Sequence, residues 1–227
     1  MIISLTGFMG CGKSSIGRRL SELLCCPYID LDSVIEEMVG RSIPEIFAKD
    51  GEAVFRQMEH AALTSVITTG CKMRIRKQSL PSAMGPSLCG QRGSTVSSSS
   101  PYSPSSNDGN PIRTTSVPLT ESTGIMVLSL GGGTVMTREC AEMVMENTIC
   151  IYLRASVDTL VTNLKDEADG RPMLQSSVSL RERIEELMSQ RADTYEKTSH
   201  IVVDTDGKSI DEIATAIITH PLFQQMQ

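Results

Sequence analysis

Short apolar runs alternate with longer amphipathic segments along most of the chain. Five of these runs, mostly Ile, Val and Leu, cover residues 2–6, 28–30, 125–130, 149–153 and 201–203. Their length and nearly continuous apolar character are typical of strands that are buried on both faces of a sheet. We therefore expect five buried strands.

The segments between these runs carry apolar residues at helical spacing. Helices are expected over about 13–24, 32–38, 52–66, 138–146, 156–164 and 179–197, with one more from residue 209 and a short one starting near Pro44. Gly40 is expected to end the second helix. Four polar residues are placed to cap helices: Asp32, Ser156, Ser179 and Ser209. Glutamates three residues after the last two predict capping boxes, namely Glu182 and Glu212. The last helix is expected to bury an apolar stripe of Ile210, Ile213, Ala214 and Ile217.

Strands that alternate with helices in this way predict an α/β fold with a five-stranded parallel sheet between two layers of helices, an α/β/α arrangement. Ligands bind at the carboxyl ends of the strands in such sheets. Polar or glycine signals fall at three of those ends, at Gly7, Asp30 and Gly131.

The alternation stops between about residues 73 and 123. Eight of the thirteen residues from 94 to 106 are serine, and apolar periodicity is absent. Such a segment buries too little apolar surface to offset its ordering entropy. We interpret 1–227 as a single domain interrupted by a disordered Ser/Pro-rich insertion, although a retained non-coding stretch would look the same.

Charge and cysteine content narrow the classes of partner. The net charge of −6 and pI of about 5.2 disfavour a nucleic-acid binder, which usually has a basic face. Seven cysteines without a metal-ligand spacing disfavour a structural zinc site and suggest a reducing cytosol. No run approaches the roughly 18 apolar residues that span a bilayer. We expect a cytoplasmic monomer that binds neither nucleic acid nor membrane.

The segment Gly7–Ser14, called here the phosphate-binding loop, matches the pattern GxxxxGK[ST] in full. It has the context that this motif requires, with a buried strand before it and a helix after it. Its backbone N–H groups can converge on phosphate oxygens at a positive helix end. Lys13 can reach the β and γ phosphates, and Ser14 can bind Mg²⁺. The motif predicts a nucleoside triphosphate, and a chance glycine-rich turn is the alternative.

Two carboxylates follow the second strand. Asp30 and Asp32 are two residues apart, so both can face the phosphates from an extended chain. One can hold Mg²⁺ through water, and the other can accept a proton from a substrate hydroxyl. The alternative for Asp32 is a helix cap alone.

Arg56 and Glu59 are three residues apart on an expected helix and can pair. An exposed salt bridge, which contributes little to stability, is the alternative.

Three further features suggest a ligand. The glycines Gly131-Gly-Gly133 follow the third strand, as close backbone approach of a ligand or a tight turn would require. Arg171 lies in the polar segment 165–178, which has the position of a lid, and is otherwise a solvated arginine. Arg191 continues an apolar helical stripe, so this buried charge needs either an intramolecular ion pair or a bound carboxylate.

Taken in order, these motifs resemble those of the shikimate kinase family. The resemblance covers residues 1–70 and 125–215. Its most specific parts are Asp30-Leu-Asp32, Gly51-Glu-x-x-Phe-Arg-x-x-Glu59, Gly131-Gly-Gly133, Arg171-Pro172 and Arg191-x-x-x-Tyr195. It implies the P-loop kinase fold with a lid, and transfer of the γ-phosphoryl group of ATP to the 3-hydroxyl of shikimate in aromatic amino-acid biosynthesis.

The resemblance also implies site residues by motif match. The residues implied to bind ATP are Gly10, Cys11, Gly12, Lys13, Ser14, Ser15 and Arg171. Those implied to bind shikimate are Asp32, Arg56, Glu59, Gly131, Gly132, Gly133 and Arg191. Ser14 and Asp30 would serve Mg²⁺, and the implied catalytic residues are Lys13, Asp32 and Arg171.

The sequence departs from the family in two places. Some members carry an adenine-stacking arginine shortly before the lid, where residues 161–165 offer only Lys165 as a partial substitute. The insertion is the other departure, and a fold can tolerate it because loop-closure entropy grows slowly with length. Two alternatives stay open: another small-molecule kinase acting on gluconate or a nucleotide, and a non-catalytic P-loop protein.

Overall fold

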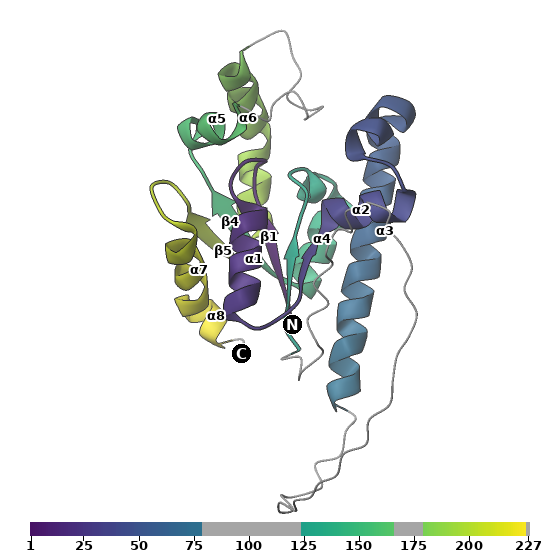
Figure 1. Cartoon of the computed structure of the whole chain (residues 1–227), viewed down its shortest axis with the longest axis vertical. Helices are drawn as coiled ribbons and strands as arrows, with labels where there is room; N and C mark the ends of the chain where they lie inside the picture. Colours follow the sequence, from purple (N-terminus) through teal and green to yellow (C-terminus); the bar gives the residue numbers. More distant parts are fainter. Residues whose placement is uncertain (79–123, 166–178, 226–227) are drawn as a thin grey trace, which may run out of the picture.

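Five parallel strands form one sheet in the order β2-β3-β1-β4-β5 (Figure 1). The structure is a computed structural model that describes residues 1–78, 124–165 and 179–225. The strands are β1 (Ile2–Thr6), β2 (Tyr28–Asp30), β3 (Met126–Ser129), β4 (Ile149–Arg154) and β5 (Ile201–Asp204). The three central strands are buried along almost their whole length, because helices cover both faces of the sheet. The predicted α/β class and parallel five-stranded sheet are confirmed.

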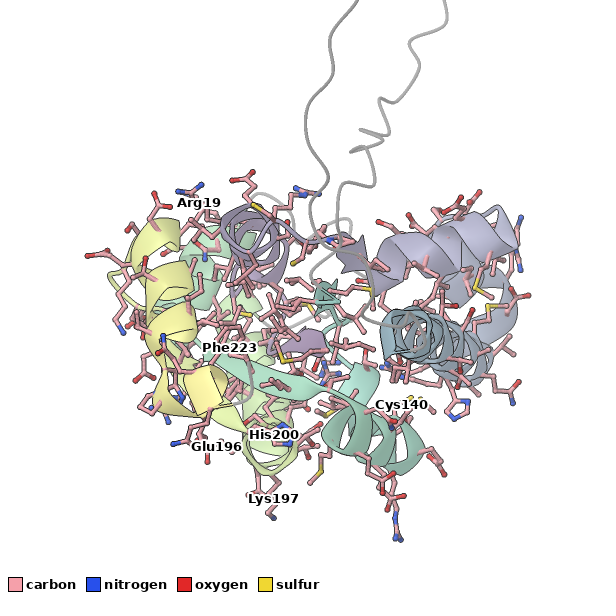
Figure 2. All side chains as sticks on the ribbon, turned by 90° about the horizontal axis from the view of Figure 1, so that it is seen from below. Arg19, Cys140, Glu196, Lys197, His200 and Phe223 are labelled. Carbon is pink, nitrogen blue, oxygen red and sulfur yellow. The ribbon has the colours of Figure 1, made fainter. Side chains whose placement is uncertain are left out.

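Helices form a layer on each face of the sheet. They are α1 (Lys13–Leu23), α2 (Leu31–Val39), α3 (Ile43–Gln78), α4 (Arg138–Asn147), α5 (Val157–Leu164), α6 (Leu180–Thr198), α7 (Ile210–Thr219) and α8 (Pro221–Gln225). The view from below places α1 and α7 on one face and α4 and α6 on the other (Figure 2). Phe223 of the short α8 is fully buried and points inward, whereas Lys197 of α6 points away from the core (Figure 2).

The predicted caps hold with one exception. Ser179 and Ser209 form capping boxes with Glu182 and Glu212, and the Ser156 hydroxyl accepts from the backbone N–H of Thr159. The prediction that Asp32 caps α2 is wrong. Asp30 is the N-cap, because its extended backbone lets its carboxylate accept the backbone N–H of Asp32. Asp32 therefore lies in the first turn of α2.

Helix α3 is longer than predicted. A non-helical Gly51, with φ at 80°, separates the short helix predicted near Pro44 from the longer one, and the helix then continues to Gln78 instead of ending near Val66. Gly70 does not break it. A Cβ atom there would lie 2.9 Å from the Cδ1 atom of Ile2, so this glycine lets α3 approach the sheet closely. The helix includes 73–78 of the predicted insertion, and residues 79–123 lie outside the described part of the chain.

The predicted apolar stripe of α7 is correct for Ile213, Ala214 and Ile217, which are buried, and wrong for Ile210, which is 45% exposed. Ile210 is the first residue of the helix, where the chain enters from a surface turn. Within the described residues, no helix is both long and apolar enough to cross a bilayer.

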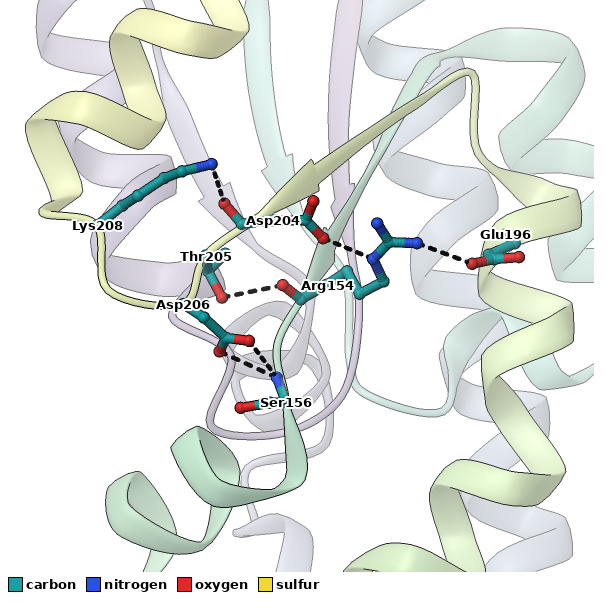
Figure 3. Close-up of polar contacts among 7 residues, drawn as sticks. All are labelled: Arg154, Ser156, Glu196, Asp204, Thr205, Asp206 and Lys208. Carbon is teal, nitrogen blue, oxygen red and sulfur yellow. Dashed lines mark hydrogen bonds and ion pairs between the residues drawn. The ribbon is translucent and has the colours of Figure 1, made fainter.

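Polar contacts join the carboxyl ends of β4 and β5 (Figure 3). Arg154 donates to Asp204 at 2.6 Å and to Glu196 of α6 at 3.3 Å. The carboxylate of Asp206 accepts the backbone N–H of Ser156 at 3.0 Å. Exposed ion pairs contribute only about 0–1 kcal/mol to stability. Together, these contacts hold the turn after β5 against the start of α5. The other end of α5 contacts the phosphate-binding loop through Asn163.

Candidate active site

The phosphate-binding loop leaves β1 with backbone torsions that its glycines allow. Gly10 and Gly12 have φ values of 80° and 93°, in the left-handed region that side chains rarely adopt. A Cβ atom on Gly10 would also lie 2.7 Å from the Cγ atom of Leu164 in α5. Gly12 is the N-cap of α1, so the loop ends at a helix N-terminus, where free N–H groups favour anions.

The ammonium group of Lys13 lies over this loop. It donates to the carbonyl oxygens of Gly7 at 2.9 Å and Phe8 at 3.0 Å. Cys11 is buried beneath it, and Ser15 is exposed in the first turn of α1. The Lys13 cation is thus held against the loop whose motif predicts phosphate binding.

Ser14 and Asp30 lie together beside the loop. The Ser14 hydroxyl donates to the Oδ2 atom of Asp30 at 3.1 Å, which leaves the lone pairs of the hydroxyl available. Oxygen ligands of this kind are those that Mg²⁺ prefers. The two residues therefore fit the cation that the sequence predicts for them.

Asp32 is the carboxylate whose proton affinity is most suited to acid–base chemistry. Burial, and next the negative charge of Asp30, raise the pKa of Asp32 to about 6, although Lys13 lowers it. A base works best when its pKa lies near the working pH. Asp32 can accept a proton at neutral pH, and it is close enough to Lys13 for the lysine charge to act on its pKa.

Arg56 pairs with a buried carboxylate, that of Glu59. Arg56 contacts Glu59 at 2.7 Å, and Glu59 is fully buried, so the alternative of an exposed salt bridge is wrong. The second oxygen of Glu59 accepts from the Thr134 hydroxyl at 2.6 Å. Burial lowers the pKa of Arg56, but Glu59 and the more exposed Glu52 outweigh burial and raise it. Arg56 is a fixed, permanently charged guanidinium group.

The three glycines after β3 are required by side chains of the site itself. A Cβ atom on Gly131 would lie 2.7 Å from the Oδ1 atom of Asp32, and one on Gly133 would lie 2.5 Å from the Nη2 atom of Arg56. Gly132 lies against the phosphate-binding loop, since its Cβ atom would lie 3.2 Å from the backbone nitrogen of Met9. This turn is where the loop, Asp32 and Arg56 meet.

Arg191 is 7% exposed on the buried side of α6, as its position in the apolar stripe predicts. In the described part of the chain its polar neighbour is the Tyr195 hydroxyl, and no carboxylate there pairs with it. The Tyr195 hydroxyl in turn donates to the carbonyl oxygen of Gly132. A buried guanidinium group without a carboxylate is costly, which favours a bound anion over an intramolecular ion pair.

Two predicted features are not part of the site that the structure describes. Arg171 and residues 166–178 of the predicted lid are outside the described residues. Lys165 is exposed at the end of α5 and has no described contact with the loop. Instead the Asn163 amide donates to the carbonyl oxygen of Gly10 at 2.9 Å.

Four polar contacts of the site were not predicted from the sequence. They are the hydrogen bonds made by Tyr28, Thr134 and Asn163, and the one from Tyr195, a residue of the Arg191-x-x-x-Tyr195 motif, to Gly132. Only Tyr28 had a usable signal. It lies two residues before Asp30 on a strand, so both side chains project to the same side. The other three make contacts across sequence separations of at least 63 residues, which no local pattern reveals.

Comparisons with known proteins agree on one family. The sequence model described as shikimate kinase matches residues 9–73 and 118–220. A shikimate kinase of Thermus thermophilus is 32% identical over 216 residues, covering 95% of this chain and 87% of that protein. The shikimate kinase of Dictyoglomus turgidum is 29% identical over 218 residues, covering 95% and 94%.

Solved structures show the same fold. The shikimate kinase from Acinetobacter baumannii in complex with shikimate has a TM-score of 0.71 and 22% identity, covering all of this chain and 95% of that one. The Aquifex aeolicus shikimate kinase has a TM-score of 0.63 and 21% identity, covering 100% and 99%. At these identities the likeness establishes the fold alone.

Proposed function

The chain belongs to the shikimate kinase family, and from that premise we propose that it transfers the γ-phosphoryl group of ATP to the 3-hydroxyl of shikimate. The observation that carries this proposal is the turn Gly131-Gly-Gly133. Cβ atoms on Gly131 and Gly133 would collide with Asp32 and Arg56, and one on Gly132 would lie tightly against the phosphate-binding loop. A donor phosphate, a base and a carboxylate anchor are thereby held at one place.

The phosphate-binding loop and Lys13 bind the donor. Backbone N–H groups from Gly10 to Ser15 and the Lys13 ammonium group contact the β and γ phosphates. Mg²⁺ would be held by Ser14 and Asp30, and when bound it neutralises charge on the phosphate oxygens. Lys13 now donates to the Gly7 and Phe8 carbonyls, and it exchanges them for phosphate oxygens when ATP binds.

Arg56 and Arg191 bind the shikimate carboxylate, with Glu59 orienting Arg56. Guanidinium–carboxylate pairs are among the stronger charge-assisted contacts. Asp32 contacts the hydroxyl groups of the substrate, and the Gly131–Gly133 turn lets them approach. Holding both reactants in this way converts a bimolecular reaction into an effectively unimolecular one.

In the chemical step, the 3-hydroxyl oxygen forms a bond to the γ phosphorus, and the bond from that phosphorus to the β–γ bridging oxygen breaks. The hydroxyl proton passes to Asp32, whose pKa of about 6 allows it to accept a proton at neutral pH and release it afterwards. Lys13, and Arg171 from the predicted lid, stabilise charge on the transferred group. We also propose that the protein acts as a cytoplasmic monomer, with its scattered thiols in keeping with a reducing compartment.

A coupled assay of ADP release with shikimate, gluconate and AMP as acceptors tests the proposal. We expect turnover with shikimate alone. Turnover only with gluconate or AMP would show that the chain is a different small-molecule kinase. ATP binding without ADP release on any of the three acceptors would show a non-catalytic P-loop protein instead.

A further inference from the structure

The Tyr28 hydroxyl lies at the predicted metal site, and the function proposed above does not use it. It donates to the Oδ2 atom of Asp30 at 2.9 Å, the same oxygen that accepts from Ser14 at 3.1 Å. The other oxygen, Oδ1, accepts the backbone N–H of Asp32 at 3.2 Å. Three donors from three different elements therefore hold one carboxylate, and Tyr28 provides the shortest of the contacts.

The tyrosine ring is held as firmly as its hydroxyl. A Cβ atom on Gly17 of α1 would lie 2.6 Å from the Cε2 atom of Tyr28, so only glycine at residue 17 leaves room for the ring. The guanidinium carbon of Arg18 lies 5.7 Å from the ring centroid.

The side-chain rotamer of Asp30 must allow two interactions at the same time. The Oδ2 atom of Asp30 accepts the hydrogen bond from the Ser14 hydroxyl, which leaves the lone pairs of that hydroxyl available, and its Oδ1 atom caps α2, whose first turn carries Asp32. If the carboxylate rotated, one of these interactions would be lost. A residue that fixes this rotamer therefore affects both the orientation of Ser14, on the nucleotide side of the site, and the position of Asp32, the proposed base.

We propose that Tyr28 is a positioning residue that fixes the Asp30 carboxylate, so that Ser14 and Asp30 can hold a divalent cation together with the nucleotide. This inference rests on the proposed function, since it assumes that the nucleotide binds with Mg²⁺. Outer residues that orient metal ligands typically change metal affinity or activity by about 10- to 100-fold when altered. Ser14 still contacts Asp30 without Tyr28, so we expect the lower end of that range.

Calorimetric titration of Tyr28→Phe with ADP, once with MgCl₂ and once with EDTA, tests this role. The variant keeps the ring against Gly17 and loses only the hydroxyl. We expect the dissociation constant of ADP with Mg²⁺ to rise about tenfold and that of ADP in EDTA to stay unchanged. Gly17→Ala, which displaces the ring but keeps the hydroxyl, should give the same Mg²⁺-specific loss if Tyr28→Phe does not fold.

Tyr152→Phe is the matched control, because it removes a phenol hydroxyl from a ring on β4, itself buried, that has no contact with Asp30. It should bind ADP like the unaltered protein in both buffers. Equal Mg²⁺ dependence in Tyr28→Phe and the unaltered protein would overturn the inference, as would equal weakening with and without Mg²⁺. If the unaltered protein gains nothing from Mg²⁺, the metal assignment also fails, while ADP release with shikimate tests the kinase reaction separately.

Discussion

The two halves of the active site are built in different ways. The proposed donor half is one segment of eight residues, Gly7–Ser14, whose backbone and Lys13 side chain we propose bind the phosphates. The acceptor half is made of side chains from α2, α3 and α6 that meet at the turn after β3. The donor half depends on local backbone conformation, whereas the acceptor half depends on buried charges that the fold must hold in place. Substitutions in the two halves should therefore differ in their effects on turnover, substrate binding and stability.

Lys13→Ala should give the largest effect. It removes the cation from the donor half and leaves Arg56, Glu59 and Arg191 of the acceptor half in place, although it also removes the charge that lowers the pKa of Asp32. We expect kcat to fall by about 100- to 1,000-fold, the usual loss for one preorganised donor, with the shikimate dissociation constant unchanged. Steady-state kinetics and calorimetry with shikimate check this. Loss of shikimate binding in this variant would break the separation between the two halves.

Glu59→Gln should damage the acceptor half through stability. Glu59 is fully buried and contacts both Arg56 and Thr134, so the variant removes the buried carboxylate of the pair and leaves Arg56 with the exposed Glu52 alone. Breaking one partner of a buried pair costs about 3–5 kcal/mol, and we expect the free energy of unfolding to fall by about 3 kcal/mol. Denaturant unfolding measures it.

Glu52→Gln is the matched control for Glu59→Gln. It removes the other carboxylate of the same arginine, at a site that is 52% exposed, and should cost less than about 1 kcal/mol. Equal losses in the two variants would show that burial does not set the strength of this pair.

Arg191→Met should weaken substrate binding without lowering stability, in contrast to Glu59→Gln. A buried guanidinium group without a described carboxylate partner opposes folding, so its removal should keep or raise the melting temperature. The same change removes a charge-assisted contact to the substrate, so we expect KM for shikimate to rise about 10- to 100-fold, which corresponds to about 1.5–3 kcal/mol.

The control for Arg191→Met is Arg181→Met on the same helix, where the arginine is exposed and pairs with Asp158. It should leave KM for shikimate unchanged. Thermal melting and kinetics of the two variants separate the outcomes. A lower melting temperature for Arg191→Met with an unchanged KM would mean that Arg191 serves the core and not the substrate.

Asp32 should set the acid limb of the activity profile. Because its folded pKa is about 6, kcat/KM should fall about tenfold per pH unit below pH 6. A pKa raised above the usual 3.8 also means that the folded protein binds its proton more tightly, so stability from this group declines as pH rises from about 4 to 6.

Asp32→Asn should then stabilise the protein above pH 6 by up to about 3 kcal/mol, the equivalent of a shift of about two pKa units, while activity is lost. Denaturant unfolding at pH 8 and pH 4 checks this, and the gain should shrink at pH 4. A flat pH–rate profile down to pH 5 would remove Asp32 as the base.

Much of the fold was predictable because its signals are local. All five strands, the two capping boxes and the phosphate-binding loop follow from residues within a few positions of one another. Errors arose where a local signal had two meanings. Asp30 and Asp32 are both good caps by composition, and the backbone conformation of Asp30 decides between them. The helix predicted to end near Val66 continues to Gln78, and the close packing of Gly70 against Ile2 depends on a residue distant in the chain.

By itself, the sequence determined the donor half, because a phosphate is bound by backbone N–H groups whose geometry eight consecutive residues specify. It also determined the identities of Asp32, Arg56 and Arg191. The tertiary structure decided what these residues can do. The pKa of Asp32, the burial of Glu59 and the position of Tyr28 depend on neighbours distant in the chain, because desolvation and charge act through space and not along the sequence.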